Sequence, residues 1–309
     1  MSDIRKSPEA PEKIAAALKD IPAEVIEGTT TCGWPFPPDM EEDIRVLVLG
    51  CGTGRDAYIA SKLIGKGGIV WGVDTDPEKI EIAKKNAPAN CRFFASDLED
   101  LIAIPDGQID LVLANCAISQ PLHTQKLIDE IWRVLSFGGE LFLCDIFCDR
   151  RMPADKFMDP EMRAAGLSSA LYIEDFRRFT TNAGFLTVRN WKTVKCKLGD
   201  DELSKQFEGI TYFNRMMRTW KIPGIIEDLC EQYNQFATYH GGIDGYEDEY
   251  VLDPGHVFVK GEPLSVCGNS MALVQNTRVA KYFTFEGNRN ENFGPYPGCG
   301  NIPYSADEE

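Results

Sequence analysis

The most informative segment of this chain is an apolar strand that ends in a glycine-rich turn. Residues 46–49 are all apolar, Gly50, Gly52 and Gly54 follow in a G-x-G-x-G pattern, and a helical pattern covers residues 57–64. Glycine lets the backbone turn sharply and approach a ligand closely, and the next helix presents free N–H groups at the same place. The segment therefore predicts the first strand of an open α/β sheet, with a nucleotide-like cofactor at its carboxyl end.

Acidic residues at the ends of the next two strand-like runs narrow the choice of cofactor. The run 68–74 ends in Asp74, and the run 91–97 ends in Asp97. A carboxylate at the tip of the second strand can accept hydrogen bonds from ribose hydroxyls, and Asp97 is placed to hold an adenine amino group. Dinucleotide-binding turns have the pattern G-x-G-x-x-G. The shorter glycine spacing found here favours S-adenosylmethionine.

Strand-like runs continue at 109–115 and 140–145, and helical patterns alternate with them, as a doubly wound parallel sheet requires. The order of these elements across residues 44 to 190 resembles that of the class I S-adenosylmethionine-dependent methyltransferases. The resemblance implies a Rossmann-like α/β fold with the cofactor beyond the carboxyl ends of the strands. The residues expected to contact the cofactor are Gly50, Cys51, Gly52, Gly54, Arg55, Asp56, Asp74, Thr75, Asp97, Leu98, Asn115 and Cys116.

Composition excludes several classes of partner. The 309 residues carry a formal net charge of −16, which argues against nucleic acid or an anionic membrane as partner. No stretch approaches the ~20 apolar residues of a membrane span, and the first residues contain no apolar signal core, which predicts a cytoplasmic protein. The ten cysteines are then expected to be reduced thiols, metal ligands or catalytic groups rather than a disulfide scaffold.

The pattern along the chain predicts three parts. Residues 1–40 form an N-terminal segment with a proline-rich substrate loop, 41–190 the S-adenosylmethionine-binding core, and 191–309 a C-terminal α+β substrate-binding region. The insertion at 149–172 follows the fifth strand and is placed to act as a lid. In the C-terminal part, we expect helices at 203–220 and 224–239, the second of which carries Cys230, and a short strand at 256–259.

Several motifs, most of them outside the generic core, suggest a narrower family. Together they resemble the arsenite methyltransferases, and the likeness extends from about residue 30 to residue 300. The resemblance implies that trivalent arsenic is held by cysteine thiolates and methylated from S-adenosylmethionine, with a thiol as reductant. The motifs lie at 31–35, 54–56, 114–116, 149–153, 170–177, 227–233 and 266–269.

The resemblance also assigns individual cysteines. Cys32 matches the family cysteine before the glycine turn, and Cys230 matches one in the C-terminal region, so we expect both to be catalytic and to bind arsenic(III). Gly166 stands where the family has a third cysteine ligand. Cys116 or Cys148 could supply a further thiol. Two other cysteines match C-terminal family cysteines without a predicted role; they are Cys267 and Cys299.

A site with two thiols has a consequence for the substrate. Arsenite has three exchangeable oxygens, whereas monomethylarsonous acid has two, so we expect the methylated species to be the better substrate. Two alternatives stay open. The acceptor could be a selenium, sulfur or oxygen centre on another small molecule, or the protein could be a non-catalytic relative that only binds arsenicals.

Overall fold

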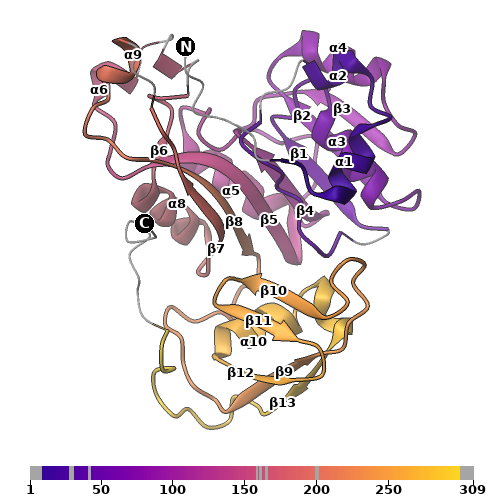
Figure 1. Cartoon of the computed structure of the whole chain (residues 1–309), viewed down its shortest axis with the longest axis vertical. Coiled ribbons are helices and arrows are strands. Elements are labelled where there is room, and N and C mark those ends of the chain that lie inside the picture. The colour runs from indigo at the N-terminus through magenta and orange to yellow at the C-terminus, as the bar shows by residue number, and fades with distance from the viewer. Residues whose placement is uncertain are drawn as a thin grey trace.

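The computed structural model describes residues 9–27, 31–40, 43–157, 159, 162–163, 166–198 and 202–299. Its core is a mixed sheet in the order β3-β2-β1-β4-β5-β8-β7, with the short strand β6 paired to β5 (Figure 1). Strands β1 to β5 are parallel, and β8 runs antiparallel to both of its neighbours. The strands are β1 (Arg45–Leu49), β2 (Ile69–Asp74), β3 (Cys91–Ala95), β4 (Ile109–Asn115), β5 (Leu135–Cys148), β6 (Leu171–Tyr172), β7 (Arg189–Lys195) and β8 (Tyr212–Trp220).

Helices cover both faces of this sheet because its strands are apolar on both sides. In β1, Val46 and Val48 belong to the same buried cluster as the apolar residues of α3 and α4. Leu47 and Leu49 point the other way and belong to the cluster that includes α5 and α8. The helices of this part are α1 (Glu12–Leu18), α2 (Ala23–Glu27), α3 (Arg55–Leu63), α4 (Pro77–Lys85), α5 (Thr124–Val134), α6 (Ala154–Phe157), α8 (Ile173–Ala183) and α9 (Glu202–Lys205).

The expected fold class is confirmed, and the five expected strands of the core are all present. The expected helix at 203–220 is wrong: α9 is a single turn, and Tyr212–Trp220 forms β8, which lies between β5 and β7 in the sheet. Most residues of β8 are buried on either face, so the strand lacks the polar alternation that would have identified it. Because β7 and β8 belong to the core sheet, the separate C-terminal unit begins after Trp220 rather than at residue 191.

The C-terminal unit is a small α+β layer with its own core. The helix expected at 224–239 is also wrong, because 235–239 is a strand and Cys230 lies in the loop before it. The expected strand at 256–259 is present. The elements are β9 (Gln235–Tyr239), β10 (Glu249–Asp253), β11 (His256–Val259), β12 (Pro263–Val266), α10 (Gly268–Gln275), the 3-10 helix η1 (Arg278–Tyr282) and β13 (Phe283–Glu286).

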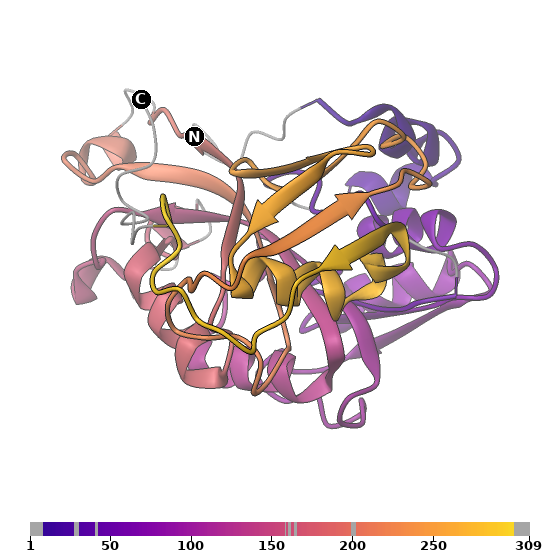
Figure 2. The same cartoon turned by 90° about the horizontal axis from the view of Figure 1, so that it is seen from below.

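This unit packs against the amino-terminal ends of the core strands. Lys221 and Gly139 are joined by a backbone hydrogen bond of 2.9 Å, and Arg278 of η1 is ion-paired with Glu140 near the start of β5. The carboxyl end of β5, where β6 pairs with Phe147 and Cys148, lies at the other end of the sheet (Figure 1). Figure 2 views the molecule from the side of the C-terminal unit, whose strands lie nearest the viewer.

The insertion at 149–172 lies beyond the carboxyl end of β5, and its movement as a lid stays a prediction. Within the residues described, α6 contacts the segment before β8, because Lys156 donates a hydrogen bond to the carbonyl of Gln206 and lies over the ring of Phe207. No helix in the described part of the chain is long and apolar enough to cross a membrane.

Candidate functional site

The glycine turn after β1 adopts backbone geometry that other residues resist. Gly50 has φ 60°, and a Cβ placed on it would lie 2.9 Å from the Cβ of Ala117. Gly54 has φ 100° and is the N-cap of α3, with no side chain capping the helix. The first N–H groups of α3 are therefore left for a ligand. The turn thus leads directly into helix N–H groups at the carboxyl end of β1, as binding of a nucleotide-like cofactor requires.

Asp74 holds this turn against the end of β2. Its Oδ2 accepts the Gly52 N–H at 2.7 Å, and its Oδ1 accepts the Asp76 N–H at 3.0 Å. Each carboxylate oxygen has a second lone pair, so Asp74 can still accept ribose hydroxyls. Asp97, exposed after β3, accepts the Glu99 N–H at 2.9 Å, while Leu98 is buried beside it. These groups fit S-adenosylmethionine, and their individual contacts with it remain predictions.

Asn115, at the end of β4, fastens the proline-rich loop to the cofactor end of the sheet. Its Nδ2 donates to Asp56 Oδ2 at 2.9 Å and to the carbonyl of Gly33 at 3.0 Å. Its Oδ1 accepts the backbone N–H of Cys32 at 3.0 Å. Arg55 completes the arrangement, because it is ion-paired with Asp56 and its guanidinium lies over the ring of Trp34. A single amide side chain thus places Cys32 next to the carboxyl end of β4.

Cys32 and Cys116 are joined as a disulfide, with their Cα atoms 5.9 Å apart. From the sequence, Cys32 is expected to be a reduced thiol that binds arsenic(III) together with Cys230. The structure instead brings Cys32 to Cys116, one residue beyond the end of β4. Cys116, expected to face the cofactor, has φ 53°, which turns the chain immediately after the strand. The two sulfurs lie where parallel α/β sheets bind their ligands.

Other cysteines surround this pair. Cys144 and Cys148 of β5 belong to the same buried cluster, and Cys196 packs against it. The thiol of Cys148 donates to the carbonyls of Arg150 at 3.0 Å and Ala170 at 3.3 Å, and burial raises its pKa to about 12, so its role as a further ligand stays a prediction. Leu167, the neighbour of Gly166, also lies in the cluster. Position 166 is therefore adjacent to the cysteine-rich end of the sheet.

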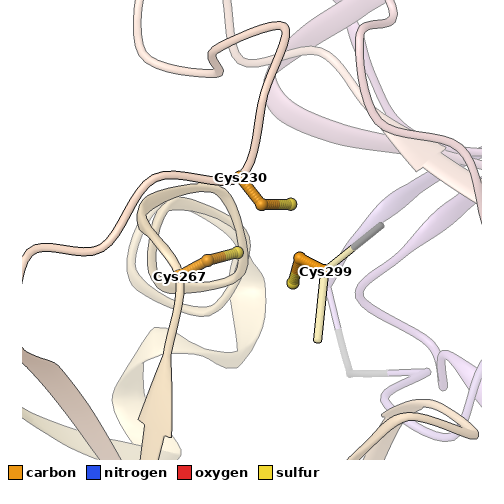
Figure 3. A group of neighbouring side chains, drawn as sticks. All are labelled: Cys230, Cys267 and Cys299. Carbon is orange, nitrogen blue, oxygen red and sulfur yellow. The ribbon is translucent and has the colours of Figure 1, made fainter. Parts of the chain in front are cut away.

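A second group of thiols lies in the C-terminal unit. The Sγ atoms of Cys230, Cys267 and Cys299 lie within 4.8 Å of one another, and the three side chains converge from separate segments (Figure 3). Cys267 is the N-cap of α10, and its Sγ accepts the Ser270 N–H at 3.4 Å. A hydrogen bond from the Cys230 thiol, with help from Ser270, lowers the pKa of Cys267, while the same bond and burial raise the pKa of Cys230.

The sequence pattern does not predict this arrangement of three thiols. Cys267 and Cys299 carried a family match but no expected role, and nothing in their spacing links them to Cys230. The one available signal was the family resemblance, because two of its motifs, at 227–233 and 266–269, contain Cys230 and Cys267.

The chain is similar to known proteins over most of its length. Residues 40–194 match the family model of a methyltransferase domain, and residues 232–305 match that of the arsenite methyltransferase C-terminal domain. An arsenite methyltransferase from Aquipseudomonas alcaligenes is 31% identical, covering 95% of this chain and 88% of that protein. One from Rattus norvegicus is 29% identical, covering 89% and 76%. The crystal structure of an arsenic(III) S-adenosylmethionine methyltransferase from Chlamydomonas reinhardtii has a TM-score of 0.89 and 36% identity, covering 93% of this chain and all of that one.

Proposed function

The chain belongs to the arsenite methyltransferase family of S-adenosylmethionine-dependent enzymes, and on that premise we propose that it methylates a trivalent arsenical held by cysteine thiolates. The observation that carries the proposal is that Cys32 lies against Cys116, with which it forms a disulfide, at the cofactor end of the sheet. Thiolates are soft ligands that suit a thiophilic centre. We propose Cys116 in place of Cys230 as the partner of Cys32, because Cys230 lies in a different thiol group.

The pair must be reduced before it can bind. A thiol reductant would open the Cys32–Cys116 disulfide by exchange, leaving two thiols and an oxidised reductant. Two thiols within bonding distance of each other can replace two oxygens of an arsenical, and each replacement releases water. No arsenic oxidation state changes in this step. The hydrogen bonds from Asn115 to the loop would hold Cys32 in place while the substrate binds.

The role of the protein in methyl transfer is placement. When bound, S-adenosylmethionine supplies a methyl group on a sulfonium sulfur, and the arsenic lone pair forms the As–C bond as the S–C bond breaks. The acceptor is a lone pair, so no side chain has to remove a proton. The glycine turn and Asp74 would orient one reactant, and Cys32 and Cys116 the other, at near-attack distance.

The proposal is tested by a transfer assay with labelled S-adenosylmethionine under reducing conditions. The acceptors are arsenite, monomethylarsonous acid, selenite and small thiols. We expect labelled product from the arsenicals, and at least a tenfold fall in kcat/KM in the Cys116→Ser variant, about 1.4 kcal/mol of transition-state stabilisation. Cys91→Ser is the matched control, since Cys91 is a buried cysteine whose thiol contacts the carbonyl of Ala57 instead. Turnover of selenite or thiols alone would contradict the arsenical assignment.

A two-thiol site also predicts the order of substrates. Monomethylarsonous acid can be saturated by Cys32 and Cys116, whereas arsenite remains one ligand short, so its kcat/KM is expected to be at least tenfold lower, about 1.4 kcal/mol. Gly166→Cys should raise arsenite turnover by supplying a third thiol. Gly166 has φ 76°, so this variant carries a backbone cost of ~1–2 kcal/mol and Gly166→Ala is the control for it. Equal turnover of both arsenicals, unchanged by Gly166→Cys, would exclude the two-thiol site.

A further inference from the structure

The thiol group of the C-terminal unit is built from three separate segments. Cys230 comes from the loop between β8 and β9, Cys267 from the start of α10, and Cys299 from the segment after β13. All three sulfurs lie within 4.8 Å of one another, and Figure 3 shows the side chains directed into the same small space. Chance proximity of two cysteines is common in a chain with ten, but convergence of three from distant segments requires the fold to hold each one.

Backbone hydrogen bonds next to each cysteine hold the three segments together. The Tyr296 N–H donates to the carbonyl of Cys230 at 2.8 Å, and the Gly268 N–H donates to the carbonyl of Glu231 at 2.9 Å. The Cys299 N–H donates in turn to the carbonyl of Tyr296 at 3.3 Å. Tyr296 also anchors its segment to β12, because its hydroxyl donates to the carbonyl of Ser265 at 2.8 Å. Backbone hydrogen bonds and the Tyr296 hydroxyl therefore hold the three cysteine-bearing segments together.

The group is remote from the cofactor end of the sheet. Ser270, which contacts Cys267, accepts a hydrogen bond from Arg189 at 3.1 Å. Arg189 begins β7 and pairs with Arg218 of β8, which pairs with Phe142 of β5. The cofactor turn and the Cys32–Cys116 pair lie beyond the carboxyl ends of the parallel strands. The three-thiol group instead contacts the sheet through Arg189, at the level of Phe142 in β5. The thiol group thus cannot be the place where the methyl group is transferred.

We infer that Cys230, Cys267 and Cys299 form a second binding site, which takes trivalent arsenic as a three-coordinate trithiolate. Soft thiolates select thiophilic centres, and three ligands saturate arsenic(III), which keeps a lone pair in its remaining position. Structural zinc sites are almost always four-coordinate. Among the residues that the structure describes, no fourth histidine, cysteine or acidic residue joins the group. The site binds arsenite without methylating it, and so goes beyond the proposed transfer reaction.

Binding is a ligand exchange with no change of oxidation state. Each As–O bond of arsenic(III) hydroxide is replaced by an As–S bond, and each hydroxide leaves as water with one proton. For three neutral thiols, the thiols supply all three protons and three waters are released. If one sulfur is already a thiolate, the third proton comes from solvent. The reaction needs no oxidant, reductant or further reactant once the thiols are reduced.

The site is tested by equilibrium dialysis of arsenite against the full-length Cys32→Ser/Cys116→Ser variant, reduced and without cofactor. We expect one arsenic bound per chain, and at least a hundredfold weaker binding when Cys299→Ser is added. Cys196→Ser is the matched control, because Cys196 is a half-buried thiol at the other end of the sheet. Melting curves check that each variant is folded. If the Cys299→Ser variant does not fold, Cys230→Ser replaces it and is expected to weaken arsenite binding to the same extent.

Two results would overturn the inference. One is that the Cys32→Ser/Cys116→Ser variant does not bind arsenite, or binds it with an affinity that neither Cys299→Ser nor Cys230→Ser changes. The other is a parallel dialysis in which Zn²⁺ binds to the same three cysteines and arsenite does not displace it, which would make the group a zinc site. Both measurements omit the cofactor and the Cys32–Cys116 pair, so they are independent of whether the protein methylates arsenicals.

Discussion

Replacing Arg218 with leucine is expected to lower the free energy of unfolding by about 3–5 kcal/mol. The Arg218 side chain is fully buried, and its Nε lies 2.7 Å from Glu140 Oε1, which is also fully buried. Asp39 and Arg278 complete a group of two cations and two anions, with Arg278 Nε 2.6 Å from Asp39 Oδ2. Removing Arg218 leaves two buried carboxylates with one cation between them. Urea denaturation measures the loss as a lower midpoint.

Two further variants make this prediction specific. Arg178→Leu is the matched control, because the exposed Arg178 pairs with Asp175 at 2.8 Å. Its loss is expected to cost no more than about 1 kcal/mol. Adding Glu140→Leu to Arg218→Leu should recover part of the stability, since the uncompensated charge is then removed. If Arg218→Leu costs no more than Arg178→Leu, the buried charges do not hold the two parts of the protein together.

Replacing Asp74 with alanine is expected to weaken S-adenosylmethionine binding by about 3–6 kcal/mol, two hydrogen bonds to a charged acceptor at ~1.5–3 kcal/mol each. Asp74 ends β2 beside the glycine turn, and its two oxygens already accept backbone N–H groups from Gly52 and Asp76. The remaining lone pairs of the carboxylate are the ones available to ribose hydroxyls. Isothermal calorimetry with S-adenosylmethionine and its demethylated product measures the change.

The controls separate cofactor contacts from the shape of the turn. Asp76→Ala removes an N-cap of α4 two residues away, so it should cost about 1 kcal/mol of stability and leave cofactor affinity unchanged. Asp74→Asn keeps an oxygen for the Gly52 N–H but loses the charge, so the turn should survive while affinity falls. Unchanged affinity in Asp74→Ala would remove Asp74 from the cofactor site.

Buried ion pairs join the core and the C-terminal unit, and each of these two parts carries its own group of cysteines. Arg278 comes from η1 in the C-terminal unit and Glu140 from β5 of the core, so the ion pairs cross between the two parts. The core carries the cofactor turn and the Cys32–Cys116 pair at its carboxyl end. The C-terminal unit carries the three-thiol group beyond the opposite end. Two separate groups of cysteines therefore lie at the two ends of the same sheet.

Local pattern was sufficient for the parallel core. Strands β1, β2 and β4 are short and largely apolar runs, and the glycine spacing after Leu49 specifies a backbone shape that depends on Gly50 and Gly54 themselves. Asp74 could be placed because the carboxyl ends of parallel strands meet at one edge. The segment that forms β8 was predicted as part of a helix, and its pairing with β5 and β7 makes it a strand.

The sequence by itself determined the fold class, the cofactor turn and the family, because these depend on residues close together in the chain. Only the tertiary structure decided which cysteines meet. Cys32 reaches Cys116 because Asn115 at the end of β4 binds the loop that carries it. Cys230 meets Cys267 and Cys299 because hydrogen bonds around Tyr296 bring the last described segment beside the loop before β9. The position of a cysteine in the sequence does not show which other cysteine it contacts, because that contact depends on packing between distant segments.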